Sequence, residues 1–175
     1  WHFMSAEADE KYRSFCREYR SIREAEGWAS GDGDYYRRLP DVAEGNPQRS
    51  IWRLRQRSFS TFLVEVLEPV EEARGRPLTI VDAGAGNGWL SNHLAHRGHD
   101  VIAVDLQADG RHGLRACVHY EAKFLPVRAT FARLPLADGT ADLVVFSASL
   151  HYADDVSETV AESVRVLTDG GHLIV

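Results

Sequence analysis

The chain has 175 residues with 20 Lys+Arg and 26 Asp+Glu, a net charge of −6, and 44% hydrophobic residues. This is the composition of one ordinary globular domain, and it excludes disordered, collagen-like and fibrous chains. No run approaches the roughly 18 apolar residues that span a bilayer, and the first ten residues lack the basic and apolar regions of a signal peptide. We therefore expect a cytoplasmic protein with no membrane partner.

The charge and the cysteines exclude further classes. An acidic chain without a broad basic stripe is a poor match for the nucleic-acid backbone, so no nucleic-acid partner is expected. Cys16 and Cys117 lie far apart and have no second pair nearby. This pattern indicates buried thiols and neither a disulfide framework nor a cysteine zinc site.

The first half of the chain has the pattern of helices and loops. Apolar residues spaced by three and four predict a helix over about residues 7–26. Three glycines and two aspartates over residues 27–34 then predict an irregular loop. A second, longer amphipathic helix is expected after Asn46 and Pro47, and Pro69 should kink or end it.

From residue 78 onward, short apolar segments alternate with helical patterns. The predicted strands cover residues 78–83, 100–105, 126–131, 142–147 and 172–175. The predicted helices between them cover residues 88–97, about 108–122 and 154–167. Such alternation indicates parallel strands with right-handed crossovers, which is a doubly wound α/β sheet.

A glycine-rich turn follows the first predicted strand. Gly84, Gly86 and Gly88 come after that strand and before a helix, where a backbone without side chains can approach a ligand closely. The next strand ends in Asp105, whose two oxygens can accept both hydroxyls of a ribose. Together these features predict a site for a cofactor that contains a nucleoside.

Two cofactor classes compete for this turn. A dinucleotide fingerprint needs a small third residue, but this chain has Trp89 there, which disfavours NAD. Asp82 lies just ahead of the glycines and would repel a pyrophosphate, whereas it suits a cationic ligand.

Four segments, in order, resemble a known family. Val81–Leu90 is similar to motif I of the class I S-adenosylmethionine-dependent methyltransferases, and Val101–Leu106 to their acidic second strand. Residues 134–152 resemble the stretch around their fourth strand, and residues 164–175 their helix, turn and fifth strand. The resemblance covers residues 78–175 and implies methyl transfer from S-adenosylmethionine, leaving S-adenosylhomocysteine.

The resemblance also implies an architecture. It predicts a Rossmann-like, mostly parallel sheet in the order 3-2-1-4-5, formed by a methyltransferase core over residues 78–175. Residues 1–77 would form a helical lid or cap. The family usually adds two further strands that this core lacks, so we expect a fragment or an incompletely ordered chain or, less favoured, a sheet completed by a partner. A homo-oligomer is a further alternative.

Carried over by position, the resemblance implies a set of cofactor contacts. Asp82, Gly84, Ala85 and Gly86 would line the methionine end, together with Ser147 and Ala148; Asp105 would hold the ribose and Leu106 would pack on adenine. The family commonly has an acid for the adenine amino group in the segment occupied here by residues 130–133. This segment has none, and Phe131 or Thr130, followed by Ala132, is expected in its place.

Methyl transfer by direct displacement needs mainly alignment of the acceptor, with a base in some cases. His151 follows the fourth strand and is the candidate base, although it also fits a simple packing role there. Trp28, Tyr35 and Tyr36 lie in or beside the predicted loop over residues 27–34. They would either close over the acceptor or pack this loop on the sheet. Tyr152 is a weaker substrate-contact candidate.

Other readings stay open beside this one. His93, His96 and His99 have a metal-like spacing, but a helix end explains them better, and no metal site is expected. Asp154 and Asp155 precede a helix and fit capping roles. The expected function is methylation of a small molecule; the alternatives are a non-catalytic, partner-dependent cofactor-binding subunit and, less favoured, an NAD-dependent oxidoreductase.

Overall fold

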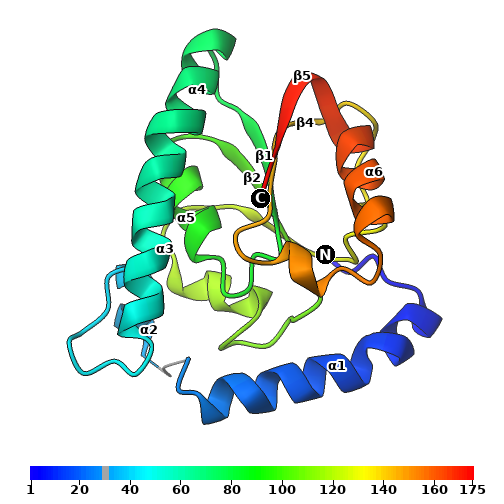
Figure 1. The fold of residues 1–175 in the computed structure, drawn as a ribbon. Helices are drawn as coiled ribbons and strands as arrows, with labels where there is room; N and C mark the ends of the chain where they lie inside the picture. Colours follow the sequence, from blue (N-terminus) through cyan, green and yellow to red (C-terminus); the bar gives the residue numbers. More distant parts are fainter. Residues whose placement is uncertain (29–31) are drawn as a thin grey trace.

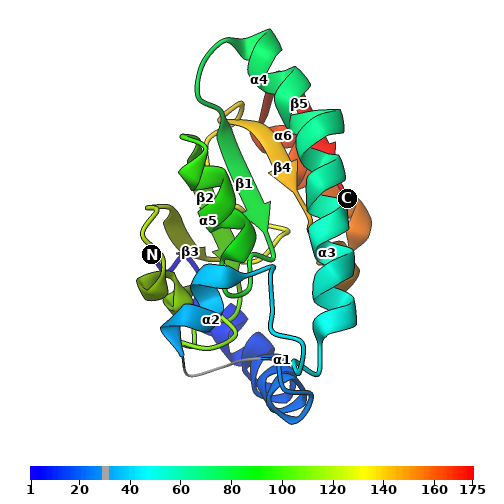
Figure 2. The same ribbon diagram turned by 90° about the vertical axis from the view of Figure 1, so that its left-hand side faces the viewer.

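The computed structural model describes residues 1–28 and 32–175 as a sheet with helices on both faces. Helices α3 (Arg49–Phe62), α4 (Glu68–Arg74) and α5 (Trp89–His96) cover one face, and α6 (Val156–Val166) covers the other (Figure 1). Helix α1 (Ala6–Ala25) runs across the edge at which the central strands end, as both views show (Figures 1 and 2). The first helix therefore lies at the edge where ligands bind in open α/β sheets.

The sheet has five strands in the order β3-β2-β1-β4-β5, and every neighbouring pair is parallel. Their bounds are β1 Thr79–Ala83, β2 Asp100–Asp105, β3 Leu125–Arg128, β4 Ala141–Val145 and β5 Leu167–Ile174. The predicted architecture and strand order are confirmed. The last strand begins earlier than the predicted residue 172, because β5 starts at Leu167, directly after α6.

The N-terminal helices are α1 Ala6–Ala25, α2 Gly33–Arg38, α3 Arg49–Phe62, a π-helical turn Leu63–Leu67 and α4 Glu68–Arg74. Helices α1 and α3 begin close to the predicted positions, whereas α2 was not predicted. Ser5 caps α1 by accepting a hydrogen bond from the Ala8 amide at 3.1 Å. Pro69 does not end the long helix, because it lies in the first turn of α4, where a missing N–H is tolerated, directly after the wider π turn.

The remaining helical elements lie between the strands. They are α5 Trp89–His96, the 3₁₀ turns Leu114–His119 and Leu150–Tyr152, and α6 Val156–Val166. The predicted helix over residues 108–122 is wrong, since only the short 3₁₀ turn forms there. Asp109 Oδ1 accepts the amides of Arg111 and His112 at 2.8 Å, and a Cβ at Gly113 would lie 2.5 Å from the Gln107 backbone. This tight turn leaves no room for a regular helix.

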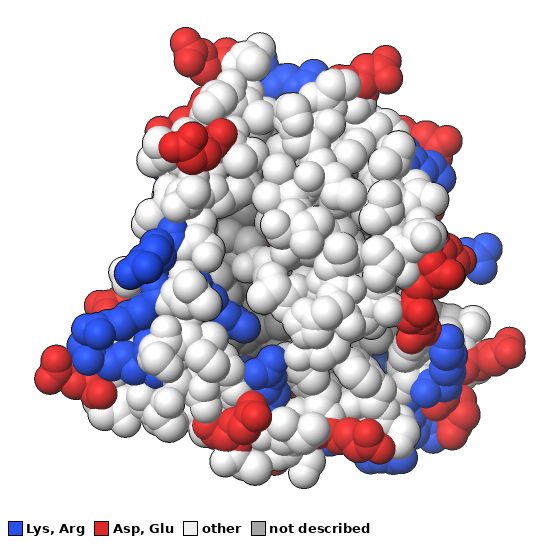
Figure 3. All heavy atoms as spheres, viewed as in Figure 1, with Lys and Arg blue, Asp and Glu red and all other residues white. Residues whose placement is uncertain are grey.

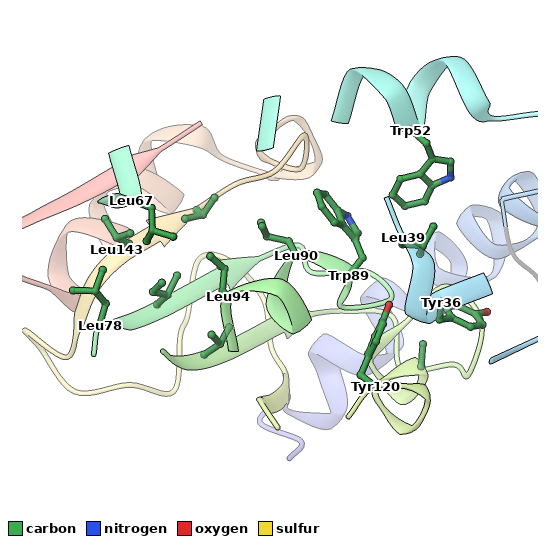
Figure 4. Packing of buried hydrophobic residues seen from close by; sticks show 14 of the residues in the cluster. Tyr36, Leu39, Trp52, Leu67, Leu78, Trp89, Leu90, Leu94, Tyr120 and Leu143 are labelled. Atoms are coloured by element: carbon green, nitrogen blue, oxygen red, sulfur yellow. The ribbon is translucent and has the colours of Figure 1, made fainter. Parts of the chain in front are cut away.

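One hydrophobic core joins the N-terminal helices to the sheet (Figure 4). Trp52 of α3 is 1% exposed, and its ring centroid lies 6.0 Å from Trp28 and 5.9 Å from Trp89 of α5. Leu67, in the π turn, belongs to the same cluster as Leu143 of β4. The core therefore crosses the expected boundary at residue 77.

Within residues 1–28 and 32–175, every helix is too short or too polar to cross a bilayer.

Candidate functional site

A cavity of about 1160 Å³, counted out to its open mouth, lies at the carboxyl ends of the strands. Figure 3 shows a hollow on this face with Lys and Arg atoms beside it. All of the cofactor residues predicted from the sequence line this cavity: Asp82, Gly84, Ala85, Gly86, Asp105, Leu106, Phe131, Ala132, Ser147 and Ala148.

The glycine-rich turn forms the floor of the cavity. Gly84 has φ +81°, and a Cβ there would lie 2.3 Å from the Ser149 Cβ, so only glycine fits without a rearrangement. The amides of Gly84 and Ala85 donate to the Val104 carbonyl at 2.8 and 3.1 Å, which fixes the turn against β2. This close packing brings backbone atoms directly to the cavity.

Asp82 is a buried carboxylate with an unused oxygen. It is 1% exposed, and the Ser91 hydroxyl donates to its Oδ2 at 2.7 Å. Its Oδ1 has no hydrogen-bond partner among the residues that the structure describes. Burial, with a smaller contribution from Asp105, raises the pKa of Asp82 to about 7. A cationic group that reaches Oδ1 would compensate for this burial.

Asp105 ends β2 and faces the same cavity. The Gly86 amide donates to its Oδ2 at 2.8 Å, and the Gln107 amide donates to its Oδ1 at 2.7 Å. Burial raises the pKa of Asp105 to about 6, while these backbone hydrogen bonds act in the opposite direction. Each oxygen keeps a further lone pair, so the carboxylate can also accept two hydroxyl groups.

The segment that the sequence connects with adenine also reaches the cavity. Thr130, Phe131 and Ala132 all line it, and the Phe131 ring packs edge-on against Phe146 at 5.3 Å between centroids. Residues 130–133 contain no carboxylate. This segment can therefore bind adenine by packing its flat ring against Phe131, and not by a hydrogen bond to an acid.

The opposite wall comes from the N-terminal helices and is aromatic and cationic. Its residues are Tyr12, Phe15, Tyr19 and Arg23 of α1, Trp28, and Trp52 and Arg55 of α3. The sequence pattern did not identify Arg23 or Arg55 as part of this wall, whereas Trp28 was expected there. Arg55 lies three residues after the buried Trp52, which places it on the inner side of α3, and this spacing was the available signal.

The predicted acceptor residues divide into two groups. Trp28 and Tyr152 line the cavity, whereas His151, Tyr35 and Tyr36 are not among the lining residues. The Tyr36 hydroxyl donates to the Arg111 carbonyl at 3.0 Å and that of Tyr35 to the Trp28 carbonyl at 2.8 Å, so both pack α2 in place.

His151 is exposed, and its ring lies 4.0 Å from the Tyr152 ring. A role for His151 as a base stays a prediction. Part of the predicted loop, residues 29–31, lies outside the described residues.

Two of the three histidines near the end of α5, His93 and His99, have separate structural partners, and His96 is exposed. His93 Nε2 lies 2.7 Å from the Leu39 carbonyl. His99 accepts the Leu78 amide at 3.3 Å through Nδ1, and its Nε2 lies 2.8 Å from Glu71. In the described part of the chain, no three His, Cys, Asp or Glu side chains form a group able to hold a metal ion.

A family profile described as "Methyltransferase domain" matches residues 81–175. The chain belongs to the class I S-adenosylmethionine-dependent methyltransferase family. This confirms the resemblance seen in the sequence. Neither the partner-dependent subunit nor the NAD-dependent oxidoreductase has support from the comparisons. Trp89 is only 5% exposed and packs against Trp52 and Phe59, which explains why a large residue occupies this position of the methyltransferase turn.

Curated methyltransferases are similar over the same region. An uncharacterized methyltransferase of Mycobacterium tuberculosis is 35% identical over 94 residues, which are 54% of this chain and 37% of that protein. Malonyl-[acyl-carrier protein] O-methyltransferase 1 of Coxiella burnetii is 28% identical over 109 residues, which are 62% of this chain and 36% of that protein. The chain spans little more than a third of the length of these relatives.

Solved structures share the fold. The PH0226 protein of Pyrococcus horikoshii matches with a TM-score of 0.50 and 22% identity over 82% of this chain and 62% of that one. A Methanococcus maripaludis protein, described as a candidate S-adenosyl-L-methionine-dependent methyltransferase, also has a TM-score of 0.50, with 21% identity over 69% of this chain and 61% of that one. At this identity, the likeness concerns the methyltransferase fold alone.

Proposed function

We propose that this chain binds S-adenosylmethionine and forms part of an enzyme that transfers its methyl group to a small-molecule acceptor. One observation carries the proposal: Asp82, which has an unpartnered buried oxygen, and Asp105 line one cavity together with the glycine turn. A ligand with an ammonium at one end and a ribose at the other satisfies both acids. Membership of the methyltransferase family supports the same ligand.

The residues of the cavity fit the parts of this cofactor. Asp82 Oδ1 would accept a hydrogen bond from the ammonium, and Asp105 would accept the ribose hydroxyls. Leu106 and Phe131 offer apolar surface to the adenine, with Ala132 beside them. Gly84, Ala85 and Gly86, with Ser147 and Ala148 after β4, would surround the methionine part.

When bound, S-adenosylmethionine supplies a methyl group on a sulfonium, ready for direct displacement. The chain then has to orient the acceptor and exclude water, since alignment supplies most of the rate in such a step. Aromatic residues of α1 and Tyr152 line the cavity and offer an apolar surface for the acceptor. Several relatives are named malonyl-[acyl-carrier protein] O-methyltransferase, so carboxyl acceptors belong in a substrate screen.

Calorimetric titration and thermal shift with S-adenosylmethionine and S-adenosylhomocysteine test the cofactor, with NAD as the control ligand. A ligand at a hundredfold over its Kd adds about 2.7 kcal/mol to the free energy of unfolding, which raises Tm by several degrees. We expect both sulfur compounds to bind and NAD not to bind. Stabilisation by NAD alone would contradict the proposal.

Asp105→Ala tests the ribose contact. Loss of charge-assisted hydrogen bonds should weaken S-adenosylhomocysteine binding by about 1.5–3 kcal/mol. Asp100→Ala is the matched control, because Asp100 is exposed at the opposite end of the same strand. Equal affinity in the two variants would remove Asp105 from the site.

A further inference from the structure

The helical wall of the cavity holds a guanidinium group that lacks a counter-charge. Arg55 is half-buried, and no carboxylate lies within ion-pair distance of it in residues 1–28 and 32–175. Burial lowers the pKa of Arg55, and the nearby Arg23 lowers it further. A cation in this position is costly unless an anion joins it.

Arg23 adds a second positive charge to the same wall. The carboxylate within ion-pair distance of it is Glu26 Oε2, at 3.7 Å, and this oxygen also accepts the Trp28 indole N–H at 2.7 Å. Arg23 Nη2 donates to the Tyr152 hydroxyl at 3.3 Å. Of the two guanidinium groups, only that of Arg23 therefore has a carboxylate within ion-pair distance among the described residues, and this carboxylate is already engaged.

Aromatic rings hold these guanidinium groups in place. The Arg55 guanidinium carbon lies 5.1 Å from the Trp28 ring centroid and 4.9 Å from that of Trp52. The Arg23 guanidinium lies 4.5 Å from the Trp28 ring centroid. The rings contact the face of the Arg55 guanidinium and leave its N–H edge available, and this planar edge matches a carboxylate with two parallel hydrogen bonds.

We propose that Arg55 and Arg23 bind a carboxylate group inside the cavity. This assignment deepens the proposed function and rests on it for the identity of the cavity. Two sources offer the same chemistry, namely the carboxylate on the methionine part of the cofactor and a carboxylate on the acceptor. A phosphate-rich ligand fits less well, because Asp82 and Asp105 on the facing wall repel multiple negative charges.

The first experiment compares two ligands that differ in one group. Wild type and Arg55→Met are titrated calorimetrically with S-adenosylhomocysteine and with S-adenosyl-3-thiopropylamine, which keeps the amine and lacks the carboxylate. If the cofactor is the source, the variant binds S-adenosylhomocysteine about ten- to hundredfold more weakly and binds the decarboxylated compound within twofold of wild type. Arg55→Lys, which keeps the charge, should recover part of the affinity.

Arg57→Met is the matched control, because Arg57 is exposed on the same helix and does not line the cavity. It should bind both compounds like wild type. Circular dichroism of each variant establishes that the helices are retained.

The second experiment tests the acceptor as the source. Benzoate and benzyl alcohol are titrated into the protein, both free and saturated with S-adenosylhomocysteine. If the acceptor carries the carboxylate, wild type binds benzoate and not benzyl alcohol, and Arg55→Met loses benzoate binding. Either result supports the carboxylate site and identifies its source.

The site is overturned if Arg55→Met binds S-adenosylhomocysteine, its decarboxylated analogue and benzoate with the affinities of wild type. This failure differs from failure of the proposed function, in which wild type itself binds neither S-adenosylmethionine nor S-adenosylhomocysteine. In that case the benzoate titration of the free protein still decides whether the two arginines bind a carboxylate.

Discussion

The two walls of the cavity differ in charge and in how the chain builds them. The sheet wall is acidic and consists of strand ends and a glycine turn, with Asp82 and Asp105 as its charged groups. The helical wall is cationic and aromatic, and its arginines, Arg23 and Arg55, come from two separate helices. The sheet wall depends on local backbone geometry, whereas the helical wall depends on how distant elements pack. This difference predicts which substitutions damage which wall.

The strongest test breaks the junction between the two walls. Trp52→Ala removes a ring that is 1% exposed and lies between Trp28 and Trp89, so the free energy of unfolding should fall by about 3–5 kcal/mol. Leu54→Ala, at a position 62% exposed on the same helix, should change it by less than about 0.5 kcal/mol. Urea denaturation measures both. A loss below about 1 kcal/mol at Trp52 would support a lid over residues 1–77 that folds separately from the sheet.

The floor of the sheet wall can be tested with two glycines of similar backbone geometry. Gly84→Ala combines φ +81° with a Cβ only 2.3 Å from the Ser149 Cβ, and should lower the free energy of unfolding by about 2–4 kcal/mol. Gly75→Ala has φ +62° and open space around it, so strain alone should cost about 1 kcal/mol. If the free energy of unfolding falls by the same amount in both variants, Ser149 moves aside without an energetic cost.

The sheet wall was predictable because each of its parts follows from a local pattern. Continuous apolar runs predicted the strands, and the glycines and Asp105 stand at strand ends, where the topology alone brings them together. The predicted helix over residues 108–122 failed for a local reason as well. The Asp109 side chain satisfies two amides in a turn, and this competes with helix formation.

The helical wall was not predictable to the same degree. Arg55 stands among other arginines of α3, and its spacing from Trp52 identifies it as inward-facing only once Trp52 is known to pack against Trp28 and Trp89. Asp154 gives a similar example. Asp155 caps α6 as predicted by accepting the Glu158 amide at 2.9 Å, but Asp154 accepts a hydrogen bond from Lys11, 143 residues away in sequence. No local pattern identifies such partners.

The acidity of the sheet wall makes ligand binding depend on pH. Asp82 has a pKa of about 7 in the folded protein against an ordinary value of 3.8, so protonation of this group favours the ligand-free fold. Its contribution to stability is therefore fully present below the ordinary pKa and is lost as the pH rises toward 7. An ammonium ligand needs the ionised form instead. The affinity for S-adenosylhomocysteine should rise by up to about tenfold per pH unit below 7 and then level off.

Asp82→Asn is the variant that isolates this effect. In this variant, the rise in S-adenosylhomocysteine affinity near pH 7 should disappear. A smaller rise near pH 6, where Asp105 titrates, should remain. Calorimetric titrations between pH 5 and 8 measure both steps. If the variant keeps the wild-type pH dependence of affinity near pH 7, another group controls binding and Asp82 does not contact the ammonium.

The smallest effect concerns the contact that holds α1 over the cavity. Asp154 Oδ2 accepts hydrogen bonds from Lys11 Nζ at 2.6 Å and from the Tyr12 hydroxyl, and these groups are largely exposed to solvent. Exposed ion pairs contribute little, so Asp154→Asn should raise hydrogen-exchange rates of α1 amides only a few-fold and change the Kd of S-adenosylhomocysteine less than about threefold. Asp155→Ala is the contrasting control, since it removes the cap of α6 and should speed exchange there and not in α1. Unchanged exchange in α1 would mean that its aromatic contacts with Tyr152 hold the helical wall without this contact.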